Sequence, residues 1–443
     1  MRWPKNPPPL SEIFKEIKDP ARVADLLRTV REPVVNGRYL HWDKLIRHTP
    51  PPGLSHREWW LALKLHRASP RFEVPLHDKS GNPFTCALVD PIPERLHRID
   101  LGAGGRIEMP DQITNPETKD RYYVGSLIEE AITSSQLEGA VTTRLVAKEM
   151  IRTGRKPRDR SEQMILNNYQ TMRRIGQLKD ERLSQELVFE IHRLMTDRTL
   201  DNPSAAGRFR RVDEDISVGN EYGEVFHAPP PAGRLEERLE AMCAFANGEI
   251  PARFIHPAIR AIILHFWLAY DHPFVDGNGR TARALFYWSM LRHGFWLFEF
   301  VSISPILLRA PTLYYRAFLY SETDDDDLTY FVLYHLDVMR RAVDELHNYI
   351  QRKTVQVQAL EARLRGLSEL NHRQRELISH ALRHPRQRYT IESYRRSHNV
   401  VYQTARTDLL DLQERGLVRA TKRGRVWVFT AVEDLERKLA ELP

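Results

Sequence analysis

Residues 272–283 bring together the side chains that transfer of a phosphorus-containing group requires. The segment reads His-Pro-Phe-Val-Asp-Gly-Asn-Gly-Arg-Thr-Ala-Arg. His272 is the residue type that takes a proton from a hydroxyl near neutral pH. Asp276 offers a hard oxygen ligand to Mg²⁺, which proteins usually hold with one or two carboxylates together with phosphate oxygens. A base and a metal ligand therefore lie four residues apart.

The same segment contains the elements of a phosphate-binding site. Gly277 and Gly279 flank Asn278 and let backbone N–H groups converge on an anion at the start of a helix. Arg280 and Arg283 are three residues apart on that helix, so both guanidinium groups can reach one phosphate chain. Each part is common by itself as a turn, a loop or a solvated helix face. Their combination in this order predicts phosphoryl or nucleotidyl transfer.

The segment matches the Fic-domain signature His-x-Phe-x-(Asp/Glu)-Gly-Asn-Gly-Arg-x-x-Arg, and on these residues the chain resembles the Fic family. Fic proteins mostly transfer AMP from ATP to a Ser, Thr or Tyr hydroxyl of a target protein, so the resemblance implies a protein adenylyltransferase. It implies His272 as general base and Asp276 as the Mg²⁺ ligand. It also implies that ATP is bound by Phe274, Gly277, Asn278, Gly279, Arg280 and Arg283, with the two arginines on the β- and γ-phosphates.

The likeness extends over residues 126–341, about half of the chain. Gly207-Arg-Phe-Arg and residues 216–225 resemble the segment that leads into the family's flap, a hairpin that aligns a target side chain beside the active site. Residues 314–318 and 327–331 resemble the closing helices of the domain. A few relatives use UTP, GTP or CDP-choline, so the choice of nucleotide stays open.

A second motif, Ser134-Ser-Gln-Leu-Glu138-Gly139, matches the family's inhibitory pattern (Ser/Thr)-x-x-x-Glu-(Gly/Asn). On a helix, this spacing places Ser134 and Glu138 on one face. The resemblance implies that Glu138 pairs with Arg283 and blocks productive binding of the γ-phosphate, in cis or across a homodimer. The alternative is a surface glutamate at a helix end. A glutamate near the pocket could also orient a water, which leaves removal of AMP by the same site as an alternative reaction.

Apolar residues at three- and four-residue spacing predict the helices that position these groups. The expected helices cover residues 126–152, 161–178, 184–196, 234–247, 256–270 and 279–293. Two β-type runs around glycines predict a hairpin over 216–226. The expected fold is mainly α, a Fic helical bundle with a small β-hairpin flap. The acidic run Asp324–Asp327 is expected to be a solvated cap for a long helix that begins at Leu328.

The length of 443 residues exceeds what one hydrophobic core normally supports, so several units are expected. We expect helices over residues 10–30 and 56–68 near the N-terminus. The predicted segments are an N-terminal subdomain (1–115), a Fic domain (116–341) with the inhibitory helix near 126–140, a connector helix (342–370) and a C-terminal domain (371–443).

The C-terminal segment has the pattern of a winged helix-turn-helix, an α+β domain. Helices over 372–383, 391–398 and 402–415 precede a two-stranded wing around Arg423-Gly424. Residues 372–430 contain 13 Arg and Lys against 5 Asp and Glu, a balance of +8 in a chain whose net charge is +7. The basic excess is therefore concentrated here.

This domain is expected to bind DNA, through a recognition helix and a wing. The candidate contacts are Gln403, Thr404, Arg406, Lys422, Arg423 and Arg425. Protein binding or dimerisation is the alternative use of such a fold. A DNA-binding domain also raises the alternative of a transcriptional regulator that uses the Fic pocket mainly to sense nucleotide.

The cysteine content and the hydropathy pattern favour a cytoplasmic protein. Only two cysteines occur, Cys86 and Cys243, so the sequence predicts no disulfide framework. No run reaches the ~18 apolar residues of a membrane span. The first nine residues lack the apolar core of a signal peptide.

Overall fold

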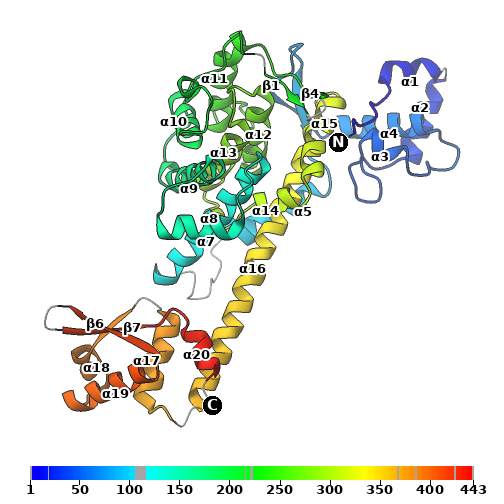
Figure 1. Ribbon diagram of the computed structural model, residues 1–443. Coiled ribbons are helices and arrows are strands. Elements are labelled where there is room, and N and C mark those ends of the chain that lie inside the picture. The colour runs from blue at the N-terminus through cyan, green and yellow to red at the C-terminus, as the bar shows by residue number, and fades with distance from the viewer. Residues whose placement is uncertain are drawn as a thin grey trace. The chain divides into compact units, whose positions relative to one another are not determined.

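The computed structural model describes residues 2–17, 19–104, 116–214, 216–219, 223–366, 369–384, 387–423 and 426–441. The chain divides into two compact units, residues 1–105 with 126–343, and residues 106–125 with 344–443. Helices dominate both units, which confirms the prediction of a mainly α fold (Figure 1).

Two buried helices form the centre of the first unit. They are α12 (Pro257–Asp271) and α13 (Asn278–Arg292), and nearly all their residues are buried. A helix that is apolar on nearly every side, as α12 is, belongs in the middle of a bundle. α13 runs beside it and buries polar side chains as well, Arg280 and Arg283 among them (Figure 1). The surrounding helices are the part of α7 (Pro116–Leu137) from Ser126 onward, α8 (Arg144–Thr153), α9 (Arg160–Leu178), α10 (Gln185–Thr196) and α11 (Leu235–Ala246).

The helix predicted over 126–152 was wrong as a single element. It ends at Leu137 and resumes as α8 at Arg144. Gly139 has a φ of +90°, a left-handed conformation that glycine adopts without strain, and this ends the helix. Glu138 therefore stands at the C-terminal end of α7, where the chain turns.

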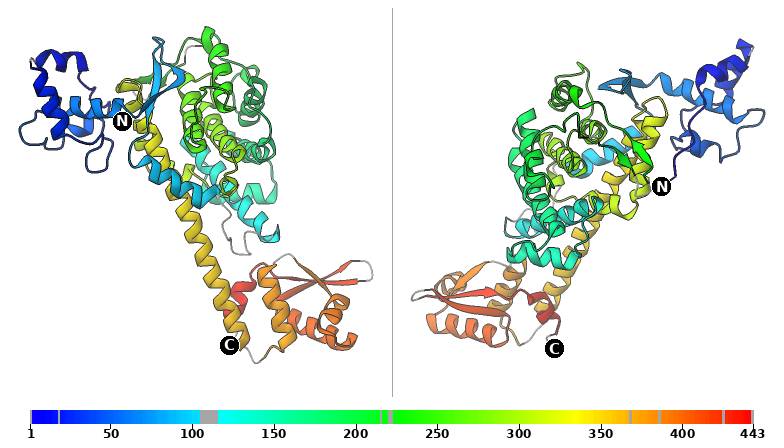
Figure 2. Two further views of the ribbon diagram at one scale, coloured as in Figure 1. Left: turned by 180° about the vertical axis from the view of Figure 1, so that it is seen from behind. Right: turned by 45° about the horizontal axis from the view of Figure 1, so that its top comes forward.

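The N-terminal helices form a small cluster with its own apolar core (dark blue in Figure 2). They are α1 (Leu10–Glu16), α2 (Pro20–Thr29), α3 (Trp42–Leu45) and α4 (His56–Ala68). The prediction for 56–68 was confirmed, and a capping box between Ser55 and Glu58 begins that helix. The single helix predicted over 10–30 was wrong, because Asp19 caps a new helix that starts at Pro20.

The acidic run before the long helix α16 (Thr329–Gly366) is largely buried, so the prediction of a solvated cap was wrong. Asp324 is 1% exposed and lies 2.7 Å from the Nζ of Lys64 on α4. Asp327 is 0% exposed, accepts a 2.5 Å hydrogen bond from the Tyr39 hydroxyl and still caps the backbone N–H of Thr329. The cations that pair with this run, Lys64 of α4 and Arg71, are distant in sequence, so local sequence does not reveal them.

Short elements complete the first unit. The hairpin of β3 (Val218–Gly219) and β4 (Val225–His227) is antiparallel and pairs Val218 with His227, so it ends one residue beyond the hairpin predicted over 216–226. The others are β1 (Arg71–His77) paired with β2 (Pro83–Ala87), α5 (Ile92–Ile99), α14 (Ser304–Arg309), α15 (Pro311–Thr323) and the short turns η1 (Asp100–Gly104), η2 (Pro203–Ala205), η3 (Ala232–Arg234) and η4 (Trp296–Glu299).

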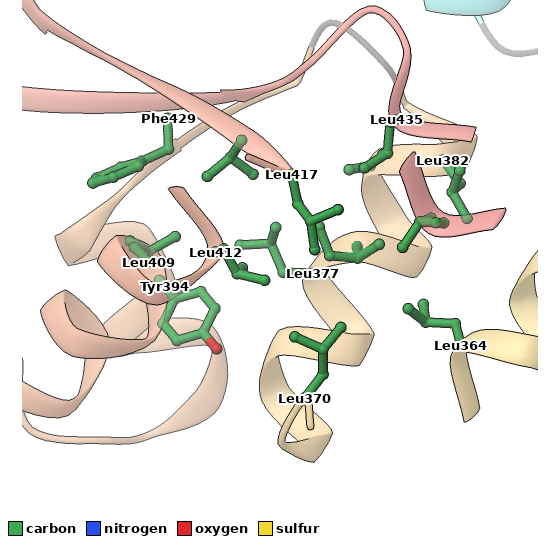
Figure 3. Close-up of a cluster of buried hydrophobic side chains, with 14 of the residues drawn as sticks. Leu364, Leu370, Leu377, Leu382, Tyr394, Leu409, Leu412, Leu417, Phe429 and Leu435 are labelled. Carbon is green, nitrogen blue, oxygen red and sulfur yellow. The ribbon is translucent and has the colours of Figure 1, made fainter. Parts of the chain in front are cut away.

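The second unit contains three helices against an antiparallel sheet. The helices α17 (His372–Arg383), α18 (Ile391–His398) and α19 (Tyr402–Glu414) agree with their predicted spans. The sheet has the order β5-β7-β6, from β5 (Arg388–Thr390), β6 (Val418–Arg423) and β7 (Val426–Ala431), and β5 was not predicted. The core joins Leu364 of α16 and Leu435 of α20 (Leu435–Glu441) to apolar residues of the three helices and the sheet (Figure 3).

Within the described ranges, none of the helices is both long and apolar enough to cross a membrane. Cys86 and Cys243 are both buried and are not joined in a disulfide.

Candidate active site

His272 follows α12 directly and is held in an unusual backbone conformation. Its φ is 45° and its ψ is 56°, in the left-handed region that non-glycine residues rarely adopt, and its N–H donates to the Leu268 oxygen at 3.0 Å. Its Nδ1 lies 3.3 Å from the Ala269 oxygen, which favours the proton on Nδ1 and leaves Nε2 to accept one. Burial lowers the pKa of His272 to about 4. The ring is therefore neutral at pH 7, as a base must be.

The side chain of Asn278 shapes the loop between α12 and α13. Its Oδ1 accepts from the N–H of Phe274 at 3.0 Å, and its Nδ2 donates to the oxygen of the same residue at 2.8 Å. Asn278 is also the first residue of α13, so the closed loop leads directly into the N-terminus of a helix. A helix N-terminus attracts anions.

His192 of α10 anchors this loop, and the sequence analysis missed it. Its Nδ1 accepts from the N–H of Gly207 at 2.9 Å, so Nε2 carries the proton and donates to the backbone oxygen of Asp276 at 2.9 Å. Its ring stacks on Phe274, with centroids 3.7 Å apart. Burial lowers the pKa of His192 to about 4, which keeps this tautomer neutral. Its partners lie 15 and 84 residues away, so no local pattern indicates this role.

Gly277 is required by both conformation and space. Its φ is +83°, and a Cβ at this position would lie 2.7 Å from the Cγ2 of Thr196. We expect Gly277→Ala to lower the free energy of unfolding by about 1–3 kcal/mol, because it adds backbone strain to a steric contact. Urea denaturation followed by circular dichroism would measure this loss. Gly223→Ala is the matched control, since its φ is also positive (+79°) but, apart from its chain neighbours, no described atom lies within 4 Å of the added Cβ. An equal loss of unfolding free energy in both variants would contradict a steric contribution at Gly277.

Arg280 and Arg283 of α13 are both 1% exposed. Arg280 donates through Nη1 to the Met195 oxygen at 3.2 Å and through Nη2 to Asp276 Oδ1 at 3.4 Å. Among the described residues, Nε of Arg280 and Nη1 of Arg283 are buried without a hydrogen-bond partner. Buried N–H groups of this kind are costly unless a ligand satisfies them, so they fit a polyphosphate.

Arg283 is held by Ser134 of α7 and by Glu138, the residue that follows α7. Nε donates to the Ser134 hydroxyl at 2.8 Å, and Nη2 donates to the Ser134 oxygen at 2.9 Å and to Glu138 Oε1 at 2.8 Å. Burial lowers the pKa of Arg283, but Glu138, together with the nearby Tyr314 and Glu130, raises the pKa overall. The ion pair expected between Glu138 and Arg283 is thus present, and it forms within one chain.

The Glu138 carboxylate also lies against Gly279 in the first turn of α13. A Cβ on Gly279 would stand 2.2 Å from Glu138 Oε1 and 3.2 Å from Arg283 Nη1. The carboxylate therefore occupies the space beside the helix N-terminus, where a phosphate would be expected to bind.

Asp276 is accessible enough to bind a metal ion together with water and phosphate oxygens. Its side chain is 39% exposed, and Oδ1 accepts from the N–H of Gly277 at 2.5 Å. No group of three or more His, Cys, Asp or Glu side chains in the described ranges could form a metal site. A single accessible carboxylate fits Mg²⁺, which takes its remaining ligands from water and phosphate.

The segment Gly207-Arg-Phe-Arg contacts the loop, and the flap strand β4 contacts the end of α12. Arg210 donates through Nε to the His272 oxygen at 2.9 Å, and its backbone N–H donates to the Pro273 oxygen at 2.8 Å. His227 of β4 lies with Nε2 2.7 Å from the Tyr270 oxygen and with Nδ1 2.7 Å from Glu322 Oε2. These contacts attach the flap to the end of α12, beside His272.

All ten site residues predicted in the first unit lie together around this loop. They are Ser134, Glu138, His272, Phe274, Asp276, Gly277, Asn278, Gly279, Arg280 and Arg283. The candidate DNA contacts lie in the second unit. Gln403 and Arg406 on α19 and Lys422 on β6 are exposed, whereas Thr404 is half-buried. Arg425 and the side chain of Arg423 lie outside the described residues.

Part of the chain matches a known protein family. Residues 182–290 match the model of the Fic/DOC family. A protein adenylyltransferase Fic from Nematostella vectensis is 24% identical over 261 residues, which cover 58% of this chain and 55% of that protein. The corresponding protein from Drosophila grimshawi is 32% identical over 108 residues, 24% of this chain and 20% of that protein. The chain thus spans about half or less of the length of these curated relatives.

The fold has a counterpart among solved structures. The crystal structure of a Fic family protein from Desulfovibrio desulfuricans G20 aligns with a TM-score of 0.52 at 19% identity, covering 78% of this chain and 97% of that one. The family match identifies a Fic domain over residues 182–290, and the solved structure has a similar fold.

Proposed function

We propose that this Fic-domain chain is a protein adenylyltransferase, which moves AMP from ATP to a Ser, Thr or Tyr hydroxyl and is restrained by Glu138. One observation carries the proposal. The loop that joins α12 to α13 begins with a neutral His272. It leads into α13, whose first two turns contain the buried Arg280 and Arg283. The adenylyltransferases to which the chain is similar support this activity.

In the proposed reaction each group has a defined task. The target hydroxyl gives its proton to Nε2 of His272 as its oxygen bonds to the α-phosphorus, and the bond to the β-phosphate oxygen breaks to release pyrophosphate. Arg280 and Arg283 hold the β- and γ-phosphates, with the N-terminus of α13 adding its partial positive charge. Mg²⁺, held by Asp276, would neutralise phosphate charge when bound.

The restraint follows from the charges around Arg283. While Glu138 Oε1 lies 2.8 Å from Nη2, the guanidinium is already neutralised, and the carboxylate beside Gly279 repels phosphate oxygens. Because the contact forms within one chain, the restraint itself needs no second copy. A homodimer is part of the proposal only in one way: contact with a second copy could move α7 and so separate Glu138 from Arg283.

Removal of AMP by the same site is the second candidate. The described hydrogen bonds engage Oε1 of Glu138, and the side chain is 28% exposed, so the carboxylate is accessible to a water that it could orient. Transfer would add AMP to a target protein, whereas removal would release AMP from a protein that already carries it.

One experiment distinguishes these functions. Glu138→Gly protein is incubated with Mg²⁺ and a mixture of nucleoside triphosphates, and its mass is measured. A gain equal to AMP supports the proposal, a different nucleotide mass corrects the substrate, and the modified peptide identifies a self-target. The adduct is then exposed to wild-type protein, and loss of AMP in this second step would support removal. Tight ATP binding without any adduct would favour a nucleotide sensor.

For the second unit we propose a winged helix-turn-helix that binds DNA, with α19 as recognition helix and β6–β7 as wing. Support comes from the turn at Asn399, whose φ of 48° joins α18 to α19, and from basic side chains at exposed positions. Arg406 and Lys422 have no ion-pair partner among the described residues. The free buried cysteines are compatible with a reducing compartment, and we include cytoplasmic location in the proposal.

DNA binding by this unit is expected to weaken about 10²-fold between 50 and 200 mM salt if roughly four phosphates are contacted. Fluorescence anisotropy with a labelled duplex would measure the salt slope, and Arg406→Ala and Lys422→Ala are each expected to reduce it by about one. Arg396→Ala is the control, because Arg396 already pairs with Glu392 at 3.0 Å. Dimerisation that is insensitive to salt, with no binding of DNA, would instead establish a protein-binding role.

A further inference from the structure

Arg160, the first residue of α9, lies against the carboxylate that we assign to Mg²⁺. Its Nη2 is 3.4 Å from Asp276 Oδ2, and its Nη1 is 3.2 Å from Asp201 Oδ1. The side chain of Arg160 is 53% exposed and that of Asp201 is 95% exposed. One half-exposed guanidinium thus joins the loop carboxylate to a second carboxylate outside the loop.

The two oxygens of Asp276 have different surroundings. Oδ1 accepts from the N–H of Gly277 and from Arg280, which is buried and cannot move away easily. Oδ2 contacts Arg160. Oδ2 is therefore the oxygen that a cation can reach from solvent, and Arg160 is the described group that stands beside it.

A divalent cation on Oδ2 and the guanidinium of Arg160 would repel each other at this separation. The structure offers a place to which Arg160 can retreat. Arg160 and Asp201 line one open pocket of about 300 Å³, together with Arg158 and Arg198. The guanidinium can leave Asp276 and stay paired with Asp201 inside this pocket.

We propose that Arg160 is a displaceable counter-ion of Asp276, which occupies Oδ2 until a divalent cation binds and then pairs with Asp201 alone. The inference rests on the proposed function, because it takes Asp276 as the cation ligand. Arg160 is a positioning residue in this view. It raises the concentration of cation at which the loop becomes loaded, and so adds a second restraint that is independent of Glu138.

The test measures cation binding and not transfer. Mn²⁺ is titrated into the full chain with a non-hydrolysable ATP analogue, and free Mn²⁺ is followed by electron paramagnetic resonance. Arg160→Gln is expected to bind Mn²⁺ about three- to tenfold more tightly, a modest factor because the pair is half exposed and screened. Asp201→Asn is expected to bind it about two- to threefold more weakly, since Arg160 then has Asp276 as its remaining partner.

Two controls make the result decisive. Arg158→Gln removes a charge from the same pocket without a described contact to Asp276, and its affinity should stay within twofold of wild type. Asp276→Asn should lose the site. Unchanged or weaker binding in Arg160→Gln overturns the inference, as does an Arg158→Gln variant that matches Arg160→Gln. If Asp276→Asn binds Mn²⁺ normally, the metal assignment fails. If cation binding shifts as expected but no variant transfers a nucleotide, the proposed function fails while the counter-ion role of Arg160 stands.

Discussion

Replacement of Glu138 by glycine is expected to raise nucleotide transfer about 10- to 150-fold. The range corresponds to one charge-assisted hydrogen bond to a phosphate, worth roughly 1.5–3 kcal/mol, which Arg283 can make once its partner is removed. Glycine also removes the carboxylate that lies 2.2 Å from the position of a Gly279 Cβ, so negative charge no longer stands at the N-terminus of α13. The two effects act in the same direction.

ATP labelled in its α-phosphate measures this gain, as label fixed to the chain or to an added target per unit time. Glu138→Gln should give an intermediate rate, because the amide oxygen can still accept from Arg283 but carries no charge. Glu129→Gln is the control on the same helix, since Glu129 pairs with Arg144 and Lys148 instead of the loop. Equal labelling by wild type and Glu138→Gly would show that the ion pair is structural and does not restrain the enzyme.

Sequence reasoning found the parts of the site that lie within one short segment. Residues 272–283 form a single loop and helix turn, so residue types and spacing were sufficient to identify His272, Asp276 and the two arginines as a group. The Ser134–Glu138 pair was identified by resemblance, and its ion pair with Arg283 bridges 145 residues of sequence. The inhibitory role of that pair stays a prediction.

The groups that hold the site in shape were missed because their contacts are distant in sequence. His192 reaches Asp276 across 84 residues and Arg160 reaches it across 116. The residues next to a histidine or arginine on an amphipathic helix do not indicate that its side chain makes such a distant contact. The same limit explains the acidic run, whose cation Lys64 lies 260 residues from Asp324. The helix break at Gly139 was different, because a local signal existed but the apolar spacing continued across it into α8.

Replacement of His272 by alanine is expected to lower transfer about 10²- to 10⁴-fold, the usual contribution of a positioned general base. The measurement is best made with Glu138→Gly as the parent, so that the loss starts from a high rate. His293→Ala is the control, since His293 follows α13 and its Nδ1 lies 2.7 Å from the Ser289 oxygen, outside the loop. ATP affinity should change little in His272→Ala, because the phosphate contacts come from Arg280 and Arg283. Retained transfer would refute the assignment of the base.

The pH dependence provides an independent check on the same residue. Burial lowers the pKa of His272 to about 4, so the base is already deprotonated at pH 6 and the rate should be level from pH 6 to 8 in this respect. Stability follows the same shift. Between the ordinary value near 6.5 and about 4, the unfolded chain binds more protons than the folded one, so stability falls as pH decreases through this range. A His272→Ala variant should lose that part of the dependence of stability on pH. A transfer rate that climbs steeply from pH 6 to 7.5 would contradict the lowered pKa. It would mean that His272 is charged in the resting site and that burial does not suppress its protonation.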